Sequence, residues 1–405
     1  MTDAAALRIL IVTPTVPYPP NWGFGIRVFN FVRELSLSHE ISVVCYADDD
    51  EQDKVTTLGQ YCTSVHTVRS PLRNLRHKRS AQLRSVLSRR SFQTLAIQTQ
   101  AMGQLIETLL SEGRFDLVQL ESSQLSSLVT ASATPWIIDE HNLEYELLQR
   151  MYEVERSPLR KFYNWLEYRK FRQEEVTAWR RSDACVLTSE RERGILALQE
   201  PGKLTHVAPN GVDIDYFSPK EIEVDSDSIV FTGLMSYRPN IDAVVFFVRE
   251  VLPLIVEAHP TARFTVVGMG APEGITSLAG PHVSIIGGVP DVRPYVWSAS
   301  VFAVPLRMGS GTRLKVLEGL AMGKAMVSTS VGCEGISVED GKHLVIADDP
   351  VSLAHAVLQL LHDADLNRRL GQAGRQLVEE RYSWVSIVRD LERFHADVIE
   401  SKRPR

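Results

Sequence analysis

Residues 305–327 read PLRMGSGTRLKVLEGLAMGKAMV. An apolar strand end leads into the glycine-rich turn Gly309-Ser310-Gly311-Thr312, a helical stretch follows, and a second glycine stop precedes another apolar strand. Backbone N–H groups at the start of a helix form an anion site, and Arg313 adds a positive charge beside it. Glu318, further along the helix, can accept hydrogen bonds from sugar hydroxyls, as an acidic residue grips ribose in dinucleotide-binding folds. This stretch therefore predicts an α/β protein that binds a phosphate-bearing ligand.

The rest of the chain alternates apolar strands with helical stretches in two similar halves. Strands rich in valine and isoleucine are typically buried on both faces of a parallel sheet, and their alternation with helices predicts βαβ units. The expected fold class is α/β, with two doubly wound parallel-sheet domains that bind at the carboxyl ends of their strands. Proline and glycine residues between Pro201 and Pro219 mark the boundary. We expect strands at 8–13, 41–46, 64–68, 117–120, 136–138 and 184–188, and then at 229–232, 263–267, 283–286, 301–304, 325–328 and 343–346.

Composition limits the class of protein. The chain of 405 residues has the length of two globular domains, and its net charge of −6 argues against a nucleic-acid-binding protein. Its four cysteines lack metal-binding spacing, and Cys45 and Cys185, which lie in apolar strand-like runs, are expected to be buried thiols, which suits a reducing cytoplasm. We recognise no signal peptide and no apolar run of 18 or more residues that would span a membrane. These features predict a cytoplasmic protein.

The turn and helix at 309–321 resemble the donor-site helix of the family 4 glycosyltransferases, a retaining group with the GT-B fold. That family carries two glutamates eight positions apart; Glu318 matches the second, and Ser310 stands in place of the first. The motif at 209–213, PNGVD, is similar to the family's interdomain linker. The resemblance implies two Rossmann-like domains facing a cleft, with acceptor-binding residues 1–205 and donor-binding residues 206–382. It also implies that a C-terminal helix at 383–400 packs back on the first domain, whereas a helix that simply completes the second domain is the alternative.

The resemblance assigns several glycines to the donor site. Gly23 and Gly25 follow the first strand, where the family's glycine loop touches the donor phosphates, although a bare turn would look the same. Gly233 follows the first strand of the second half, and Gly288 lies in a loop that holds the nucleotide base in the family. Asp291, in that same loop, is more simply explained as a helix N-cap.

Cationic groups for the diphosphate depart from the family pattern. Leu234 and Asn240 stand where the family has an arginine and a lysine, so Arg238 is a substitute if its loop bends inward. Arg313 is the better candidate. Lys315 is two helical positions away and points in another direction, so it is either a donor contact, a solvated side chain or a group aimed at the acceptor. Glu334, after the strand at 325–328, is a candidate sugar contact.

Polar residues after the strand at 136–138 suggest a catalytic site. His141 is the most versatile of them near neutral pH, and the family often places a histidine here beside the transferred sugar. A structural histidine that caps a helix is the alternative. Glu121, which follows the strand at 117–120, is a candidate acceptor contact.

The function that the resemblance implies is sugar transfer from a nucleoside-diphosphate sugar to a hydroxyl of a saccharide or lipid-linked acceptor, in polysaccharide biosynthesis or a related pathway. The expected catalytic residues are His141, Arg313 and Glu318. A UDP- or GDP-linked sugar serves as co-substrate, with no other cofactor and no metal ion. Two alternatives stay open: a catalytically degenerate protein that binds nucleotide sugars, and a sugar epimerase on the same scaffold. An NAD-dependent oxidoreductase is disfavoured, because Gly23-Phe24-Gly25 is not followed by the third glycine of its motif.

Positive charge is concentrated in one window. No Asp or Glu occurs from Lys54 to Ile106, which holds nine Lys and Arg residues. Around residues 69–93, leucines and valine interleave with arginines, as in a basic amphipathic helix that attaches to an anionic membrane surface. We expect peripheral contact with the inner leaflet, and a merely solvated basic helix is the alternative.

Overall fold

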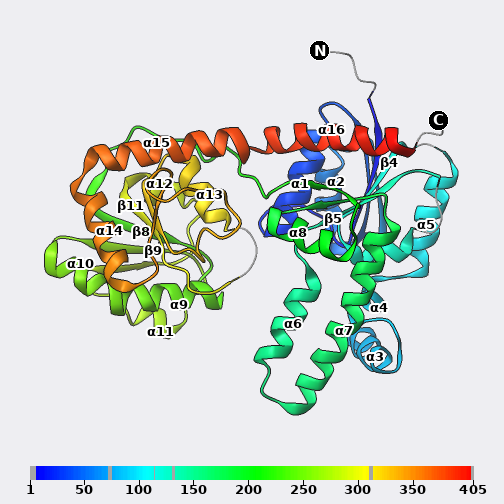
Figure 1. Ribbon diagram of the computed structural model, residues 1–405, viewed down its shortest axis with the longest axis horizontal. Coiled ribbons are helices and arrows are strands. Elements are labelled where there is room, and N and C mark those ends of the chain that lie inside the picture. The colour runs from blue at the N-terminus through cyan, green and yellow to red at the C-terminus, as the bar shows by residue number, and fades with distance from the viewer. Residues whose placement is uncertain (1–5, 72–74, 114, 130–132, 310–312, 403–405) are drawn as a thin grey trace. The chain divides into compact units, whose positions relative to one another are not determined.

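The computed structural model describes residues 6–71, 75–113, 115–129, 133–309 and 313–402. The chain divides into two compact units (Figure 1). Unit 1 comprises residues 1–209 and 388–405, and unit 2 comprises residues 210–387. None of the helices in these described ranges is both long and apolar enough to cross a membrane.

Unit 1 is built on a seven-stranded parallel sheet in the order β3-β2-β1-β4-β5-β6-β7. The central strands are buried and consist mainly of valine, isoleucine and leucine, as expected for a sheet covered by helices on both faces. The order in which successive strands are added to the sheet reverses between β1 and β4, which is the usual place for a ligand site. The strands are β1 Arg8–Thr13, β2 Glu40–Ala47, β3 Ser64–Arg69, β4 Leu117–Leu120, β5 Trp136–Glu140, β6 Ala184–Leu187 and β7 Leu204–Val207.

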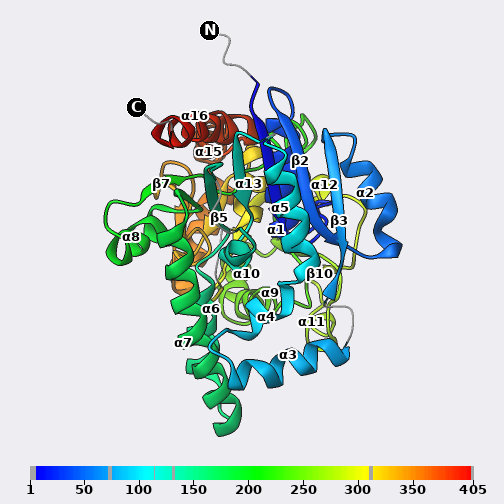
Figure 2. The same cartoon turned by 90° about the vertical axis from the view of Figure 1, so that its right-hand side faces the viewer.

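The helices of unit 1 include a long hairpin formed by α6 and α7 (Figure 2). Their bounds are α1 Gly23–Leu35, η1 Asp49–Glu51, α2 Gln52–Leu58, α3 Leu75–Leu87, α4 Phe92–Ile97, α5 Gln100–Ser111, η3 Ser123–Leu128, α6 Glu144–Val154, α7 Pro158–Arg181 and α8 Glu190–Gln199.

Unit 2 repeats this plan with a six-stranded parallel sheet in the order β10-β9-β8-β11-β12-β13. Its reversal lies between β8 and β11. The strands are β8 Asp225–Thr232, β9 Arg263–Val267, β10 Val283–Ile286, β11 Ala299–Val304, β12 Met326–Ser328 and β13 Val345–Ile346. The helices are α9 Arg238–Phe246, η4 Phe247–Val251, α10 Leu252–Ala258, α11 Glu273–Thr276, α12 Arg293–Ser298, α13 Leu314–Ala321, α14 Pro350–His362 and α15 Ala364–Arg381.

The last helix, α16 at Trp384–Lys402, begins beside a serine cap. The hydroxyl of Ser383 accepts a hydrogen bond from the Ser386 N–H at 3.2 Å. The helix belongs to both units, because residues up to 387 group with unit 2 and residues from 388 group with unit 1. Its apolar face is buried, and in unit 1 the ring of Phe394 stacks on His206 at 5.1 Å between centroids.

Two features of unit 1 differ from the sequence prediction. Strand β5 continues through Asp139 and Glu140, which pair with Val186 and Leu187 of β6, so these two acids lie within the strand and not after it. The partners that stabilise them inside the sheet are described below. Strand β7 was not predicted, because it is a half-buried edge strand without a continuous apolar run.

Candidate functional site

A cluster of polar side chains lies at the carboxyl ends of β4 and β5 in unit 1. His141 directly follows β5, and Glu121 directly follows β4. The His141 Nε2 atom lies 2.9 Å from Oε2 of Glu121 and 3.5 Å from Oδ2 of Asp139. Phe24, in the first turn of α1, stacks on the His141 ring with centroids 4.5 Å apart. Carboxylates and an aromatic ring therefore fix the orientation of this imidazole, which keeps some exposed surface.

Glu121 itself has no exposed surface. Its second oxygen, Oε1, accepts a hydrogen bond from the Gln119 amide at 2.8 Å. Burial raises the pKa of Glu121, and the hydrogen bond from His141 opposes that rise. The structure thus places Glu121 in direct contact with His141.

A buried ion pair between Arg27 and Asp139 lies next to this cluster. Arg27 donates two hydrogen bonds of 2.7 Å to the two carboxylate oxygens of Asp139. The same guanidinium donates to the carbonyls of Ala208 and Pro209 at 2.8 and 3.2 Å. Burial alone would raise the pKa of Asp139, but the charge and hydrogen bonds of Arg27 hold it below its usual value. Arg27 is buried inside unit 1, so it fixes the position of the site.

Glu121, Asp139 and His141 bring three potential metal ligands within 4.8 Å of one another. Each of these groups already has strong protein partners: Arg27 engages both oxygens of Asp139, and Gln119 and His141 engage Glu121. A cation would have to compete with these contacts. The arrangement is therefore better suited to orienting an imidazole.

A second group of buried acids lies on the other side of β5. Glu140 accepts a 2.7 Å hydrogen bond from the Trp179 indole, and burial raises its pKa to about 8. Glu175 of α7 accepts hydrogen bonds from the backbone N–H groups of Glu144 and Tyr145, both at 3.1 Å, at the start of α6. Burial raises the pKa of Glu175 well above its usual range, and the neighbouring Glu140 raises it further. Glu140 therefore links β5 to α7, and Glu175 links α7 to the start of α6.

In unit 2, a lysine from α13 reaches the loop after β8. The Lys315 ammonium donates to the Thr232 carbonyl at 2.7 Å and to Oδ1 of Asn240 at 2.8 Å. It also lies over the Phe231 ring, 4.1 Å from the centroid. Gly233 makes this approach possible, because a Cβ atom there would lie 2.7 Å from both the Lys315 Nζ and the Asn240 amide nitrogen.

The position of Lys315 decides whether it is solvated and whether a positive charge lies near position 240. The alternative that Lys315 is a solvated side chain is wrong, since its ammonium is packed against β8 and α9. The positive charge missing from position 240 is supplied there by Lys315, which contacts the Asn240 side chain. Burial lowers the pKa of Lys315 to about 7 and raises that of Glu318, one helical turn further along α13, to about 7.

Arg313 occupies the position just before α13 and is buried. Its guanidinium approaches the backbone of Gly309, where a Cβ atom would lie 3.0 Å from Nη2; Gly309 also has a φ of 139°, which favours glycine. Glu318 keeps part of its surface exposed. The predicted anion-binding residues Ser310, Gly311 and Thr312 lie outside the described residues.

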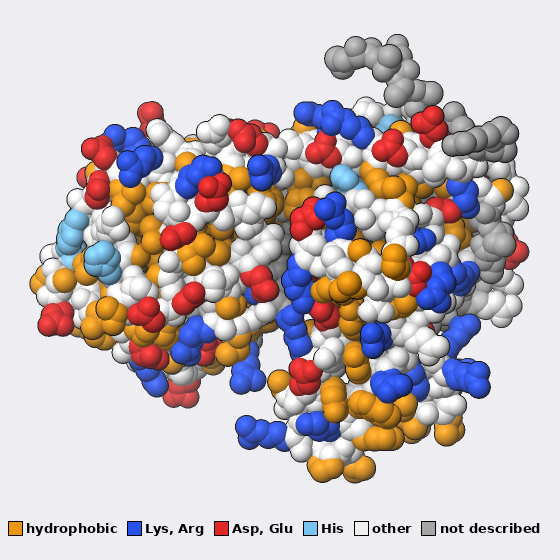
Figure 3. Space-filling view, viewed as in Figure 1, with side chains coloured by type: hydrophobic (Ala, Val, Ile, Leu, Met, Phe, Trp, Pro, Cys, Tyr) orange, Lys and Arg blue, Asp and Glu red, His pale blue; other side chains and the backbone are white. Residues whose placement is uncertain are grey.

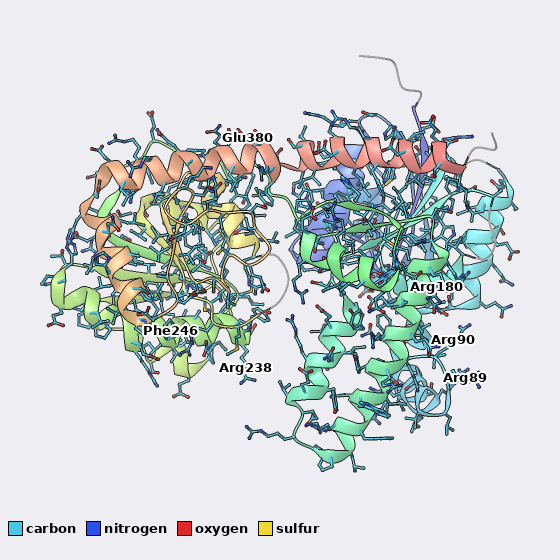
Figure 4. The ribbon with its side chains drawn as sticks, viewed as in Figure 1. Arg89, Arg90, Arg180, Arg238, Phe246 and Glu380 are labelled. Carbon is cyan, nitrogen blue, oxygen red and sulfur yellow. The ribbon has the colours of Figure 1, made fainter. Side chains whose placement is uncertain are left out.

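Among the described residues, the other predicted donor residues make no observed contact with Lys315 or Arg313. Arg238 is exposed at the start of α9 (Figure 4), and Glu334 is exposed in the turn after β12. Gly288 follows β10 and faces Met269. Gly23 begins α1 with open space around it, whereas a Cβ atom at Gly25 would lie 2.9 Å from the Trp22 ring. Asp291 accepts a hydrogen bond from the Arg293 N–H at 2.9 Å, but Val292 is the N-cap residue of α12, so Asp291 lies one residue before the predicted capping position.

Sequence reasoning did not single out Phe24, Asp139 or the contact between Lys315 and Asn240, and it did not include Arg27 in the site. The one available signal was position: Phe24 and Arg27 lie in the first two turns of the helix after β1, next to the reversal in the sheet.

Two family models match successive parts of the chain. Residues 23–216 match the model described as Glycosyltransferase Family 4, and residues 226–363 match the model described as Glycosyl transferases group 1. An uncharacterized 44.6 kDa protein from the cps region of Klebsiella pneumoniae is 21% identical over 392 residues, covering 93% of this chain and 96% of that protein. A phosphatidyl-myo-inositol mannosyltransferase of Mycobacterium leprae is 28% identical over 204 residues, covering 48% of this chain and 54% of that enzyme.

A solved structure shares the fold over nearly the whole chain. The Anabaena protein Alr3699/HepE, in complex with UDP, has a TM-score of 0.70 at 13% identity, covering 96% of this chain and 100% of that one. Two doubly wound parallel-sheet units and two consecutive family matches lead to the same assignment. The chain is a glycosyltransferase with the GT-B fold, and it belongs to the family 4, group 1 glycosyltransferases.

Proposed function

We propose that the protein transfers a sugar from a nucleoside-diphosphate sugar to a hydroxyl of a saccharide or lipid-linked acceptor, with retention of anomeric configuration and without a metal ion. The observation that carries the proposal is the Lys315 ammonium in unit 2. An ammonium has three N–H donors, and the contacts with Thr232 and Asn240 use two of them. The third donor and the charge are then available to a ligand phosphate.

The donor site that we propose combines fixed charges with a helix start. Arg313 and Lys315 lie at the beginning of α13, where the positive end of the helix dipole also points. Groups held in place before the reaction stabilise charge that develops on a leaving diphosphate without further reorganisation. Glu318 accepts hydrogen bonds from hydroxyls of the donor in this proposal. The departing phosphate takes the proton of the attacking acceptor hydroxyl, so atoms balance without a separate base.

His141 is proposed to contact the transferred sugar or the acceptor. Its ring is held by Glu121 and Phe24, so its polar edge has a defined direction. Arg27 and Asp139 act through it as positioning residues. This role needs no metal ion at the three-ligand cluster.

The donor is proposed to be a UDP- or GDP-linked sugar. The Anabaena protein with this fold has been solved in complex with UDP-glucose, and a Corynebacterium glutamicum relative is named a GDP-mannose-dependent mannosyltransferase. Another relative acts, by its name, on a phosphatidylinositol lipid. That name supports a lipid-linked acceptor. A saccharide acceptor, a cytoplasmic membrane surface and polysaccharide biosynthesis as the pathway class are further parts of the proposal.

Membrane contact through residues 69–93 is part of the proposal. On α3, Leu83 and Leu87 are 73% and 94% exposed, which is unusual for large apolar side chains. Arg84, Arg89 and Arg90 are exposed beside them. An anionic leaflet would accept both kinds of side chain.

A thermal-shift panel with UDP, GDP, ADP, CMP, NAD and the corresponding sugar conjugates tests the donor assignment. A ligand at 100 times its Kd adds about 2.7 kcal/mol of stability, which raises the melting temperature of a domain of this size by roughly 5–11 °C. Stabilisation by one nucleoside diphosphate and its sugar conjugate is the expected result. Stabilisation by NAD alone would overturn the proposal, and no response to any ligand would favour the catalytically degenerate alternative.

A further inference from the structure

A cavity of about 650 Å³ lies within unit 1, apart from the cluster around His141. The end of α3, helix α4, η3 and the middle of α7 line it and leave it partly open to solvent, and Figure 2 shows α3 and α4 beside α7. Its wall carries serine and threonine hydroxyls together with four cationic side chains and one carboxylate, Glu174. The four cations are Arg89, Arg90, Lys170 and Arg181.

The carboxylate in this cavity is already engaged. Glu174 accepts hydrogen bonds from the backbone and hydroxyl of Ser91 and from the Thr94 hydroxyl, at 2.9, 2.5 and 2.7 Å. It therefore fastens the start of α4 to α7. The same wall is left with an excess of positive charge.

The cations are held mainly by neutral groups. Arg90 donates to the Gln98 side chain at 2.9 Å, and Arg181 donates to the Val129 carbonyl at 3.1 Å. Lys170 donates to the Ser85 carbonyl and lies 3.7 Å from Glu167. An arginine has five N–H donors, so a single neutral partner orients it without using up its charge or its other donors. Such a wall is suited to an anion with several acceptor oxygens, above all a phosphate.

Apolar side chains border the cationic wall. Val86 and Leu166 line the cavity, and the exposed Leu83 and Leu87 of α3 are nearby in sequence. The α6–α7 hairpin adds further exposed apolar residues, and Figure 3 shows hydrophobic side chains grouped with lysine and arginine over this end of unit 1. On the hairpin these are Leu147, Met151, Val154, Leu159, Phe162 and Trp165. A soluble anion would need no such border, whereas an amphiphile would.

We propose that this cavity binds the phosphate headgroup of an anionic membrane lipid, while the exposed side chains of α3 and the hairpin enter the bilayer interface. Arginine and lysine next to leucine, phenylalanine and tryptophan is the combination that binds anionic bilayers. The inference rests on the membrane contact proposed above and gives it a specific site. It is independent of the donor site in unit 2.

Vesicle co-sedimentation at low salt tests the cavity directly. Phosphatidylcholine vesicles with and without 30% phosphatidylglycerol are compared for the wild type and for Arg89→Gln/Arg90→Gln. The matched control is Arg368→Gln/Arg393→Gln, which removes the same charge from two exposed arginines outside the cavity. Loss of two cations at the surface should weaken binding to anionic vesicles about 30-fold, which corresponds to about 2 kcal/mol. The control should bind like the wild type, and Leu83→Ser/Leu87→Ser should also bind weakly.

Soluble glycerol phosphate separates the two possible sources of the phosphate. If it stabilises the wild type in a thermal-shift assay but anionic vesicles do not bind, the cavity serves a soluble ligand and the lipid assignment is overturned. Equal weakening in the cavity variant and the control would mean general surface attraction and would overturn the proposal. The proposal would also be overturned if all variants bound anionic vesicles equally well, if the wild type bound neutral and anionic vesicles equally well, or if it bound neither. The cavity variant should keep the wild-type response to nucleoside diphosphates, so failure here is distinguishable from failure of the donor assignment.

Discussion

The buried pair of Arg27 and Asp139 should be among the most sensitive points of unit 1. Both side chains are essentially inaccessible, and two hydrogen bonds of 2.7 Å join them. Replacing Arg27 by methionine leaves the Asp139 carboxylate buried without its counter-charge, which costs about 3–5 kcal/mol. At roughly 2–4 °C per kcal/mol for a unit of this size, the transition of unit 1 should fall by roughly 6–20 °C.

Differential scanning calorimetry provides the assay, with the transition of unit 2 as an internal control. The double variant Arg27→Met/Asp139→Asn removes both charges and should be less destabilised than the sum of the single variants, by about 0.5–3 kcal/mol. Arg27→Lys keeps the charge but loses the paired hydrogen bonds to Asp139. It replaces Arg27→Met in the calorimetric measurement if the methionine variant does not fold. A loss below about 1 kcal/mol in Arg27→Met, or strict additivity in the double variant, would refute this reasoning.

Four further outcomes follow from contacts elsewhere in the two units. Lys315 has a pKa of about 7 and a bound phosphate favours its charged form, so nucleoside-diphosphate affinity should fall from pH 6.5 to 8.5, and calorimetric titration should show no such fall in Lys315→Gln. The folded-state pKa of Glu140, about 8, exceeds its unfolded value of about 4.3, so stability should decrease as pH rises through this range, and less so in Glu140→Gln on thermal scans. Gly268→Ala should destabilise unit 2 by several kcal/mol in urea titrations, because its Cβ atom would lie 1.7 Å from the Gly233 carbonyl oxygen. Gly194→Ala, in open space inside α8, should instead gain up to about 1 kcal/mol.

The sheets were predictable because fully buried parallel strands appear as uninterrupted apolar runs. Strands β1 and β4 begin and end at the predicted residues, and so do β9 and β10. Strand β7 was missed because it lies at the edge of its sheet, where half-buried positions tolerate Thr205 and His206. Strand β5 is longer than predicted because Arg27 and Trp179 compensate two acids that would otherwise end it.

Helix α13 and His141 stood out in sequence because the residues around each of them are close together along the chain. Their partners did not. Arg27 and Asp139 are 112 positions apart, and Lys315 and Asn240 are 75 positions apart. A lone arginine in an apolar helix, or an asparagine in place of a family lysine, acquires meaning only when the fold brings its partner to it.

Calorimetric titration with UDP and GDP, alongside UMP and GMP, tests the central claim that unit 2 binds a donor diphosphate through Lys315. One diphosphate should bind more tightly than its monophosphate, and Lys315→Gln should weaken that binding about 10- to 150-fold, as expected for the loss of a charged hydrogen bond. Lys342→Gln, which changes an exposed lysine of the same unit, should bind like the wild type. Equal affinity in wild type and Lys315→Gln, or no binding of either diphosphate, would contradict the claim.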